Sequence, residues 1–544
     1  MKKSVLSAEC RVLSLLAALV LVSSCATMNS KPALDLKITN GRILDGTGAP
    51  WFRGDVGVRG DTIVAIGDLH DVPATATIDA HERIVSPGFI DLLGQSQNSV
   101  FADPHLEPKV RQGVTTEVTG EGKSPGPSKD GKFLSLGDYF AAVEKNRSAI
   151  NFALLVGADN PREMVIGDIN RKPTADEMRE MERIVDQAMR DGAIGISTSL
   201  IYVPGMFSTT DELVNLARVA AARGGVYFTH MRDEGDQIDD GLDEAFRIGR
   251  EAKIPVNIWH LKTAGRANWG RMPHVIDRIL AARAEGIDAA ANVYPYPASG
   301  TSLSTLAPSW SMEGGYTELQ KRLTDPAMRA KISEDLARAY AKRGEKAIWV
   351  GAIGPGFEQY QKKFIEDIAK EMGVAPEEAL IRLFSGPPYS PQVIFFSMSE
   401  DDVQYALKQP FVSVGADSGA PPPAARLANA SQHPRAYGTF ARVAGHYVRD
   451  AHLFTLEEAV RKMTSQAADR CNFADRGILR AGMKADIAIF DPNAIRDIAT
   501  FADPHQFAEG VSDVIVNGIP VLLDSKMTGS LPGRVLRGKG YEAH

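Results

Sequence analysis

Residues 226–271 read VYFTHMRDEGDQIDDGLDEAFRIGREAKIPVNIWHLKTAGRANWGR and contain two short runs rich in β-branched and aromatic residues, VYFTHMR and VNIWHLK. Such runs are typical of strands. Between them, Ile238, Leu242, Phe246 and Ile248 recur at roughly helical spacing, with charged residues at many of the other positions. The segment therefore predicts a strand, a helix and a second strand, which is the repeating unit of a parallel α/β fold.

Each predicted strand carries one histidine near its C-terminal end, His230 and His260. In a parallel barrel, the C-terminal ends of the strands form the active-site face. Neutral imidazole is the commonest protein ligand for metals. Two histidines at matching positions on neighbouring strands favour a metal or catalytic pair. The alternative is a pair of core histidines that only pack on their strands.

The same alternation of strands and helices extends over the middle of the chain, where eight candidate strands occur: 89–93, 115–119, 151–157, 193–200, 226–232, 256–262, 287–296 and 411–417. Eight strands with intervening helices predict an α/β fold of the (β/α)8, or TIM, barrel type over residues 87–474. Residues 297–410, between the seventh and eighth strands, are predicted to form an insertion over the barrel mouth.

The two ends of the chain show a different pattern, with short alternating runs and turn signals such as Asn40-Gly41 and Gly60-Asp61. Residues 26–86 and 475–544 both have this character. Two all-β pieces that flank a long α/β region predict one small β-sandwich built from both chain ends.

Residues 1–25 have the features of a secretory leader, with Lys2 and Lys3 before the apolar run 12–22. The run ends in Val-Ser-Ser-Cys at Cys25, which resembles the signal box of bacterial lipoproteins. This resemblance implies a lipidated Cys25, and the alanine at position 26 implies sorting to the periplasmic face of the outer membrane. The alternative is ordinary cleavage near this point with a free Cys25.

Composition narrows the classes of function. A formal net charge of −7 over 544 residues gives no sign of a nucleic-acid-binding surface. The three cysteines match neither a metal-binding spacing nor a disulfide framework.

Several motifs, in the expected order, resemble those of the amidohydrolase superfamily and of its N-acyl-D-amino-acid deacylase (D-aminoacylase) branch. They are SPGFID (86–91), QGVTTEVTGEG (112–122), IYVPGMFSTTDEL (201–213), THMRDEGD (229–236), WHLKTAGRANWGR (259–271), VGADSGA (414–420), HPRAYGTFARVAGHYVRD (433–450) and RGILRAGMKADIAIFDP (476–492). The resemblance implies a metal-dependent (β/α)8 barrel beside a small β-sandwich made from both chain ends.

The resemblance also assigns roles to single residues. His230 and His260 match the metal-binding histidines of the fifth and sixth strands. Asp417 matches the aspartate that ends the eighth strand and accepts a proton from the attacking water. Its alternative role is to form a turn before Ser418-Gly419.

Two departures from the family pattern concern the metal. The His-x-His pair expected after PGFID is replaced by Leu93 and Gln95, which predicts that the second metal position is missing. The cysteine expected near the end of the second strand is also absent, and Glu121 lies at or next to its place. We therefore predict one zinc ion held by Glu121, His230 and His260, with an open fourth position for water. The alternative is that Glu121 is a solvent-facing loop residue.

The family resemblance places Tyr202 and Lys262 near the substrate carboxylate, and Arg435 is a further candidate contact for an anion. Lys262 follows His260 by two residues, so the two side chains share one face of the strand. A surface-facing cation at the strand end is the alternative for Lys262.

The predicted activity is metal-dependent hydrolysis of the amide bond of an N-acyl amino acid, with the D-enantiomer favoured by the resemblance. The implied partner is a small molecule, and the membrane is contacted only through the lipid anchor. Two alternatives remain open: a hydrolase of cyclic amides, as in the related dihydroorotases and hydantoinases, and an envelope binding protein whose catalytic site has decayed. The sequence does not predict the oligomeric state.

Overall fold

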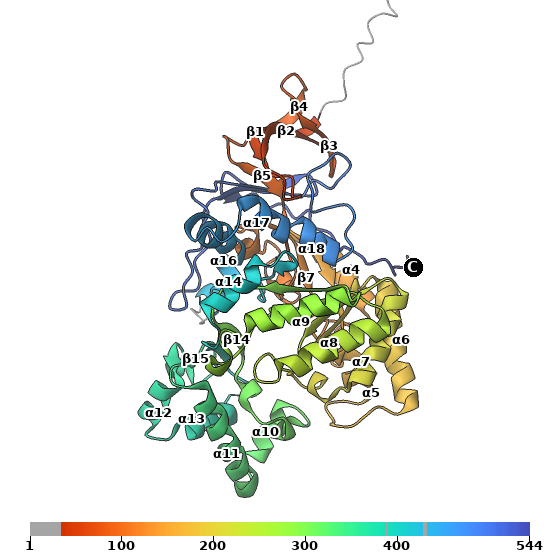
Figure 1. Ribbon diagram of the computed structural model, residues 1–544. Helices are drawn as coiled ribbons and strands as arrows, with labels where there is room; N and C mark the ends of the chain where they lie inside the picture. Colours follow the sequence, from red (N-terminus) through yellow and green to blue (C-terminus); the bar gives the residue numbers. More distant parts are fainter. Residues whose placement is uncertain (1–33, 388, 428–431, 544) are drawn as a thin grey trace, which may run out of the picture.

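The computed structural model describes residues 34–387, 389–427 and 432–543 (Figure 1). The predicted leader and the predicted lipidation site, Cys25, lie outside the described residues. Of the helices in the described part of the chain, none combines the length and the apolar character that a membrane span requires.

The middle of the chain forms the predicted barrel of parallel strands. The strands are β6 (Phe89–Asp91), β7 (Val114–Thr119), β8 (Asn151–Leu154), β9 (Val156–Gly157), β10 (Gly195–Ser199), β11 (Val226–His230), β12 (Val256–Ile258), β13 (Ala289–Val293) and β18 (Val412–Val414). They follow one another in this order in two sheets, one of β6 to β8 and one of β9 to β18. The two sheets meet at Leu155, the residue that separates β8 from β9. An isolated parallel bridge between Gly94 and Ser418 connects the first strand to the last. The predicted (β/α)8 barrel is thereby confirmed.

Helices surround the strands, and several of them are visible on one side of the barrel in Figure 1. The helices are α2 (Ser99–Ala102), α3 (Glu107–Val110), α4 (Leu136–Asn146), α5 (Asp159–Val165), α6 (Ala175–Asp191), α7 (Thr210–Ala222), α8 (Ile238–Ala252), α9 (Met272–Ala284), α14 (Glu400–Lys408), α16 (Arg435–Arg442), α17 (Leu456–Met463) and α18 (Ser465–Arg470). Helix α8 is the one predicted between the two histidine strands. It buries Ile238, Leu242 and Ile248, and acidic residues occupy its first turn, where the helix dipole favours negative charge.

Both chain ends contribute to one nine-stranded sheet, as predicted for the β-sandwich. Its strands are β1 (Leu34–Ile43), β2 (Phe52–Arg59), β3 (Thr62–Gly67), β4 (Ala74–Asp79), β5 (Ile84–Pro87), β19 (Ile487–Phe490), β20 (Val511–Val516), β21 (Ile519–Leu523) and β22 (Lys526–Met527). The two halves join where β5 pairs antiparallel with β19. Apolar side chains from both halves, among them Ile38, Val85 and Ile489, form a common buried core.

The last residues of the chain leave this sheet and run along the barrel. The amide of Phe152 donates to the carbonyl of Arg534 (2.9 Å), and the amide of Leu536 donates back to Phe152 (2.7 Å). Farther on, Gly538 donates to the carbonyl of Gly192 (3.0 Å). The end of the chain, which the sequence pattern assigned to the sandwich, therefore pairs with barrel backbone.

The insertion has a sheet and a buried core of its own. Its elements are β14 (Ser299–Ser302), α10 (Tyr316–Arg322), α11 (Pro326–Arg343), β15 (Ile348–Val350), β16 (Lys363–Phe364), α12 (Ile365–Met372), α13 (Pro376–Ser385) and β17 (Gln392–Phe395). Figure 1 shows it on the side of the barrel opposite to the sandwich. Helix α14 packs against α9, β13 and β18, so the chain has returned to the barrel before residue 410, where the sequence pattern ended the insertion.

Candidate metal centre and substrate cavity

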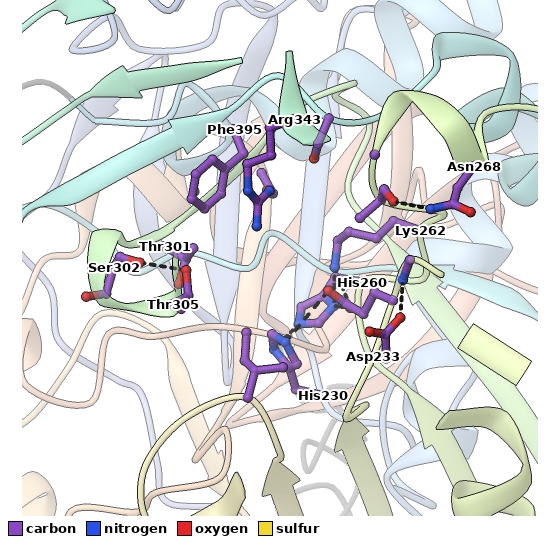
Figure 2. Close-up of a pocket in the computed structure, with 18 of the residues that line it drawn as sticks. His230, Asp233, His260, Lys262, Asn268, Thr301, Ser302, Thr305, Arg343 and Phe395 are labelled. Atoms are coloured by element: carbon purple, nitrogen blue, oxygen red, sulfur yellow. Dashed lines mark hydrogen bonds and ion pairs between the residues drawn. The ribbon is translucent and has the colours of Figure 1, made fainter. Parts of the chain in front are cut away.

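Three side chains converge at the C-terminal ends of the barrel strands (Figure 2 shows the two histidines). His230 ends β11, His260 follows β12 by two residues, and Glu121 lies in the loop after β7. Glu121 Oε1 is 2.9 Å from His230 Nδ1 and 3.2 Å from His260 Nε2, and these two nitrogens are 2.9 Å apart. The structure thus brings together the three residues that the sequence proposed as metal ligands.

The electrostatics of this cluster keep its carboxylate charged. Burial acts to raise the pKa of Glu121, but the hydrogen bonds with His230 and His260 hold that pKa well below its usual range. Burial and the charge of Lys262 oppose protonation of His260, whereas the nearby carboxylates of Glu234, Asp417 and Glu121 raise its pKa to about 9.

The donor set fits one divalent metal ion. Two imidazole nitrogens and a carboxylate oxygen lie within 4.8 Å of one another, and they are the only group of this kind among the described residues. Two histidines and one carboxylate are a common ligand set for a catalytic metal with an open coordination position. The backbone of His260 has φ of +36°, and its amide donates to Asn292 Oδ1 (2.7 Å). Because that φ is unfavourable for a residue with a Cβ atom, the conformation indicates a functional constraint on the imidazole.

Gln95, in the segment after the first barrel strand, supplies a side-chain amide to the site. Gln95 Nε2 donates to Glu121 Oε2 (2.8 Å) and to Asp417 Oδ1 (3.1 Å). Leu93 is fully buried in the apolar core of the barrel. Gln95 therefore links the carboxylates of Glu121 and Asp417. The sequence analysis considered Gln95 only as a metal ligand and did not predict this role.

Lys262 has partners within the site. Its Nζ atom donates to Glu234 Oε1 (2.6 Å) and lies 2.7 Å from His260 Nδ1. Burial acts to raise the pKa of Glu234, but the charges of Lys262, His230 and His260 hold it below its usual range. Lys262 lines the cavity, where Glu234 engages its ammonium, and its predicted contact with the substrate carboxylate stays a prediction. The sequence analysis missed Glu234, although it lies in the motif THMRDEGD, four residues after His230.

Asp417 lies within hydrogen-bond distance of two site residues. Its Oδ2 atom is 2.7 Å from Arg435 Nη1, and its Oδ1 atom accepts from Gln95. Burial raises the pKa of Asp417, although the charges of Arg435 and His260 oppose that shift. Its φ of +51° is a left-handed backbone conformation that is uncommon for residues other than glycine.

A buried ion pair holds the residues on both sides of Asp417. Asp91 Oδ1 accepts from the amide of Ala416 (2.8 Å), and Lys109 Nζ donates to the carbonyl of Ser418 (2.6 Å). Lys109 Nζ also donates to Asp91 Oδ2 (2.6 Å), and both side chains are completely buried. We call Asp91 and Lys109 the clamp, because together they fix the backbone before and after Asp417.

The other two predicted substrate contacts lie in different surroundings. Tyr202 lines the cavity, and its hydroxyl is hydrogen-bonded to Thr301 of the insertion. Arg435 does not line the cavity in the described chain; it is paired with Asp417, donates to the carbonyl of Gly300 (3.0 Å) and lies over the ring of Tyr294. In the structure Arg435 contacts Asp417, and its predicted contact with an anionic substrate stays a prediction.

A cavity of about 590 Å³ opens above the cluster. Barrel loops line one part of it, and the insertion lines another part with Thr301, Ser302, Arg343 and Phe395 (Figure 2). A volume of several hundred cubic ångströms, with polar groups converging on one region, is typical of sites for small molecules. The site can therefore hold one metal ion at Glu121, His230 and His260. Asp417 lines the same cavity and can accept a proton from a small ligand bound there.

Comparison with known proteins identifies the family. The family model described as "Amidohydrolase family" matches residues 425–522. A D-aminoacylase from Alcaligenes xylosoxydans xylosoxydans is 37% identical over 524 residues, which cover 93% of this chain and 98% of the relative. The chain belongs to the D-aminoacylase family of amidohydrolases.

Two further members of this family extend the likeness. An N-acyl-D-glutamate deacylase from the same organism is 36% identical over 93% of this chain and 96% of its own. The structure of an N-acyl-D-glutamate deacylase from Bordetella bronchiseptica was solved with zinc and a phosphonate inhibitor that mimics the tetrahedral intermediate. It is 35% identical and aligns with a TM-score of 0.79, covering 93% of this chain and all of that chain. The structural likeness therefore extends over nearly the whole of both chains.

Proposed function

We propose that this protein is a zinc-dependent hydrolase that cleaves the amide bond of N-acyl-D-amino acids. The observation that carries the proposal is the buried cluster of Glu121, His230 and His260, with Asp417 beside it, at one side of a cavity for a small molecule. Family membership supports the substrate class, because the relatives are named D-aminoacylase and N-acyl-D-glutamate or N-acyl-D-aspartate deacylase.

The three cluster residues would hold the zinc ion. When bound, zinc polarises a carbonyl group as a Lewis acid and lowers the pKa of water to about 7. Gln95 orients Glu121 through its amide. Glu234 Oε1, 2.9 Å from Nδ1 of His260, can accept the proton that Nδ1 carries when Nε2 faces a metal ion. Such outer contacts fix the direction in which ligand atoms point.

Asp417 is the proton acceptor in this scheme. It takes a proton from the attacking water and passes that proton to the nitrogen of the leaving amino acid. Its Oδ2 atom is ion-paired with Arg435, whereas Oδ1 contacts only the neutral amide of Gln95 in the described site. Oδ1 is therefore the more basic oxygen and the one that carries the proton. The products are a carboxylate and a free amine.

The test combines metal analysis with turnover. Elemental analysis of the protein beginning at Ala26 is expected to find about one zinc per chain, as expected for one catalytic site. Asp417→Asn is expected to keep its zinc but to lose about 100- to 10,000-fold in kcat, the usual contribution of general acid–base catalysis. Glu121→Gln is expected to lose zinc, and Asp401→Asn, on the outer helix α14, serves as the control.

Three results would argue against the proposal. Full turnover by Asp417→Asn would refute the role of that residue. Absence of zinc after incubation with the ion, together with tight binding of an N-acyl-D-amino acid, would favour a binding protein without catalysis. Faster hydrolysis of a cyclic ureide than of N-acyl-D-amino acids, measured side by side, would favour the cyclic-amide alternative.

We also propose that lipid on Cys25 anchors the protein at the periplasmic face of the outer membrane. The support is the leader pattern that ends in Val-Ser-Ser-Cys, followed by alanine. Cys25→Ala is expected to abolish incorporation of labelled fatty acid and to release the protein from the membrane fraction. Membrane retention of the variant at the level of the wild type would refute the anchor.

A further inference from the structure

The cationic side chains that line the cavity differ in their partners. Four of the five are engaged by other residues: Arg232 with Glu244, Lys262 with Glu234, Arg266 with the carbonyl of Glu345, and Lys342 with Asp236. The fifth is Arg343, which forms no ion pair and no hydrogen bond with any part of the chain that the structure describes. It is thus the cavity cation that remains available to an anionic ligand.

The position of Arg343 is defined by the elements around it. It is the last residue of α11, and its guanidinium carbon lies 4.3 Å from the ring centre of Phe395 on β17. Stacking on an aromatic face holds a guanidinium group in place while its N–H donors stay free. Desolvation by burial lowers the pKa of Arg343 to about 10, so the group keeps its charge at neutral pH.

Arg343 faces the metal residues across the cavity. Figure 2 shows Arg343 and Phe395 on one side of the cavity and His230 and His260 on the opposite side. The hydroxyl groups of Ser302 and Thr305 belong to the same insertion wall. An extended ligand whose scissile amide lies at the metal residues would present its far end to this wall.

We propose that Arg343 binds the side-chain carboxylate of the substrate, so that the preferred substrates are N-acyl-D-amino acids with an acidic side chain. This inference rests on the hydrolase function proposed above. The α-carboxylate is only one carbon from the scissile nitrogen and must stay near the metal residues. A carboxylate at the end of the side chain extends away from them, and a guanidinium group can bind it with two parallel hydrogen bonds.

An unpaired guanidinium also discriminates against neutral side chains. A neutral ligand that fills the same space would cover the charge of Arg343 without pairing it, and a buried charge that is left unpaired is costly. The contrast between acidic and neutral side chains of equal size is therefore the signature of this subsite. Glutamate and glutamine form such a pair.

The experiment compares N-acetyl-D-glutamate, N-acetyl-D-glutamine and N-succinyl-D-leucine as substrates of the zinc-loaded protein. The wild type is expected to favour the glutamate compound. Arg343→Met is expected to lower kcat/KM for that compound about 10- to 100-fold, mainly through KM, and to leave the glutamine compound nearly unchanged, as for the loss of one charge-assisted contact. Arg343→Lys is expected to keep part of the preference. The control, Arg338→Met, removes an exposed guanidinium from the same helix.

The other outcomes overturn the proposal in distinguishable ways. An equal loss on the glutamate and glutamine compounds would assign Arg343 to the α-carboxylate or to structure. A preference for N-succinyl-D-leucine that depends on Arg343 would assign it to a charged acyl group. If the wild type hydrolyses none of the three, the proposed function fails, and calorimetry on the metal-free protein decides the subsite. Tighter binding of N-acetyl-D-glutamate than of N-acetyl-D-glutamine, lost in Arg343→Met, would still support it, and equal binding would refute it.

Discussion

Lys109→Met should lower both the stability of the barrel and the activity that depends on the position of Asp417. The Nζ atom of Lys109 donates to Asp91 and to the carbonyl of Ser418, and both members of this clamp are completely buried. The buried carboxyl of Glu117 lies close enough for its charge to act on Lys109. Methionine keeps most of the apolar stem but leaves the charge of Asp91 uncompensated. Removing one partner of a buried ion pair costs about 3–5 kcal/mol, which is a large part of the stability of a typical domain.

The activity of the variant should fall for a different reason. Asp417 has a left-handed backbone conformation, and the clamp fixes the residues before and after it. Without Lys109, the carbonyl of Ser418 loses its donor, so the backbone that sets the position of the Asp417 carboxylate is held on one side only, by Asp91. We expect a lower kcat at a nearly constant KM, because the substrate contacts on the cavity wall are unchanged.

The assay measures urea unfolding by tryptophan fluorescence, since Trp259 is fully buried in the barrel, together with kcat on an N-acyl-D-amino acid. Arg476→Met is the matched control, because Arg476 forms a buried ion pair with Asp486 away from the cavity. The control should lose stability but keep its kcat. The double variant Asp91→Asn/Lys109→Met should lose less stability than the sum of the two single variants. A Lys109→Met variant with wild-type kcat, or strict additivity in the cycle, would refute the clamp.

Three further predictions concern other parts of the molecule. Gln95→Leu is expected to weaken zinc affinity about 10- to 100-fold in competition with a chromophoric chelator, because Glu121 loses the amide that orients it; unchanged affinity would contradict this role. Deleting residues 531–544 is expected to lower the unfolding temperature, because Phe152 loses backbone hydrogen bonds to the chain end, and an unchanged temperature would show that this pairing contributes little. In the chain beginning at Ala26, Cys471 is the only cysteine, and its burial raises the pKa of its thiol, so it should resist alkylation at pH 8 until urea is added; rapid labelling of the native protein would contradict its burial.

Local patterns in the sequence were sufficient for much of the fold. The apolar spacing in residues 238–248 predicted α8, since a helix that lies on a sheet must present one apolar face to it. The runs that end in His230 and His260 predicted β11 and β12, and parallel strands of a barrel end on one face. The boundaries between the units were predicted less well. Helix α14 lies in the range predicted for the insertion but packs against the barrel, and the chain end, predicted for the sandwich, pairs with barrel backbone.

The sequence by itself determined which side chains could hold a metal and which elements would carry them. Only the tertiary structure showed the contacts among these residues. Gln95 donates hydrogen bonds to both Glu121 and Asp417. Glu234 accepts a hydrogen bond from the ammonium of Lys262, and Arg435 forms an ion pair with Asp417. The tertiary structure also showed that Arg343 reaches the cavity without a partner in the described chain. These contacts join residues from different loops, some of them hundreds of positions apart in the sequence. Local periodicity in the sequence cannot predict these contacts, because they form only when the barrel closes and the insertion covers its mouth.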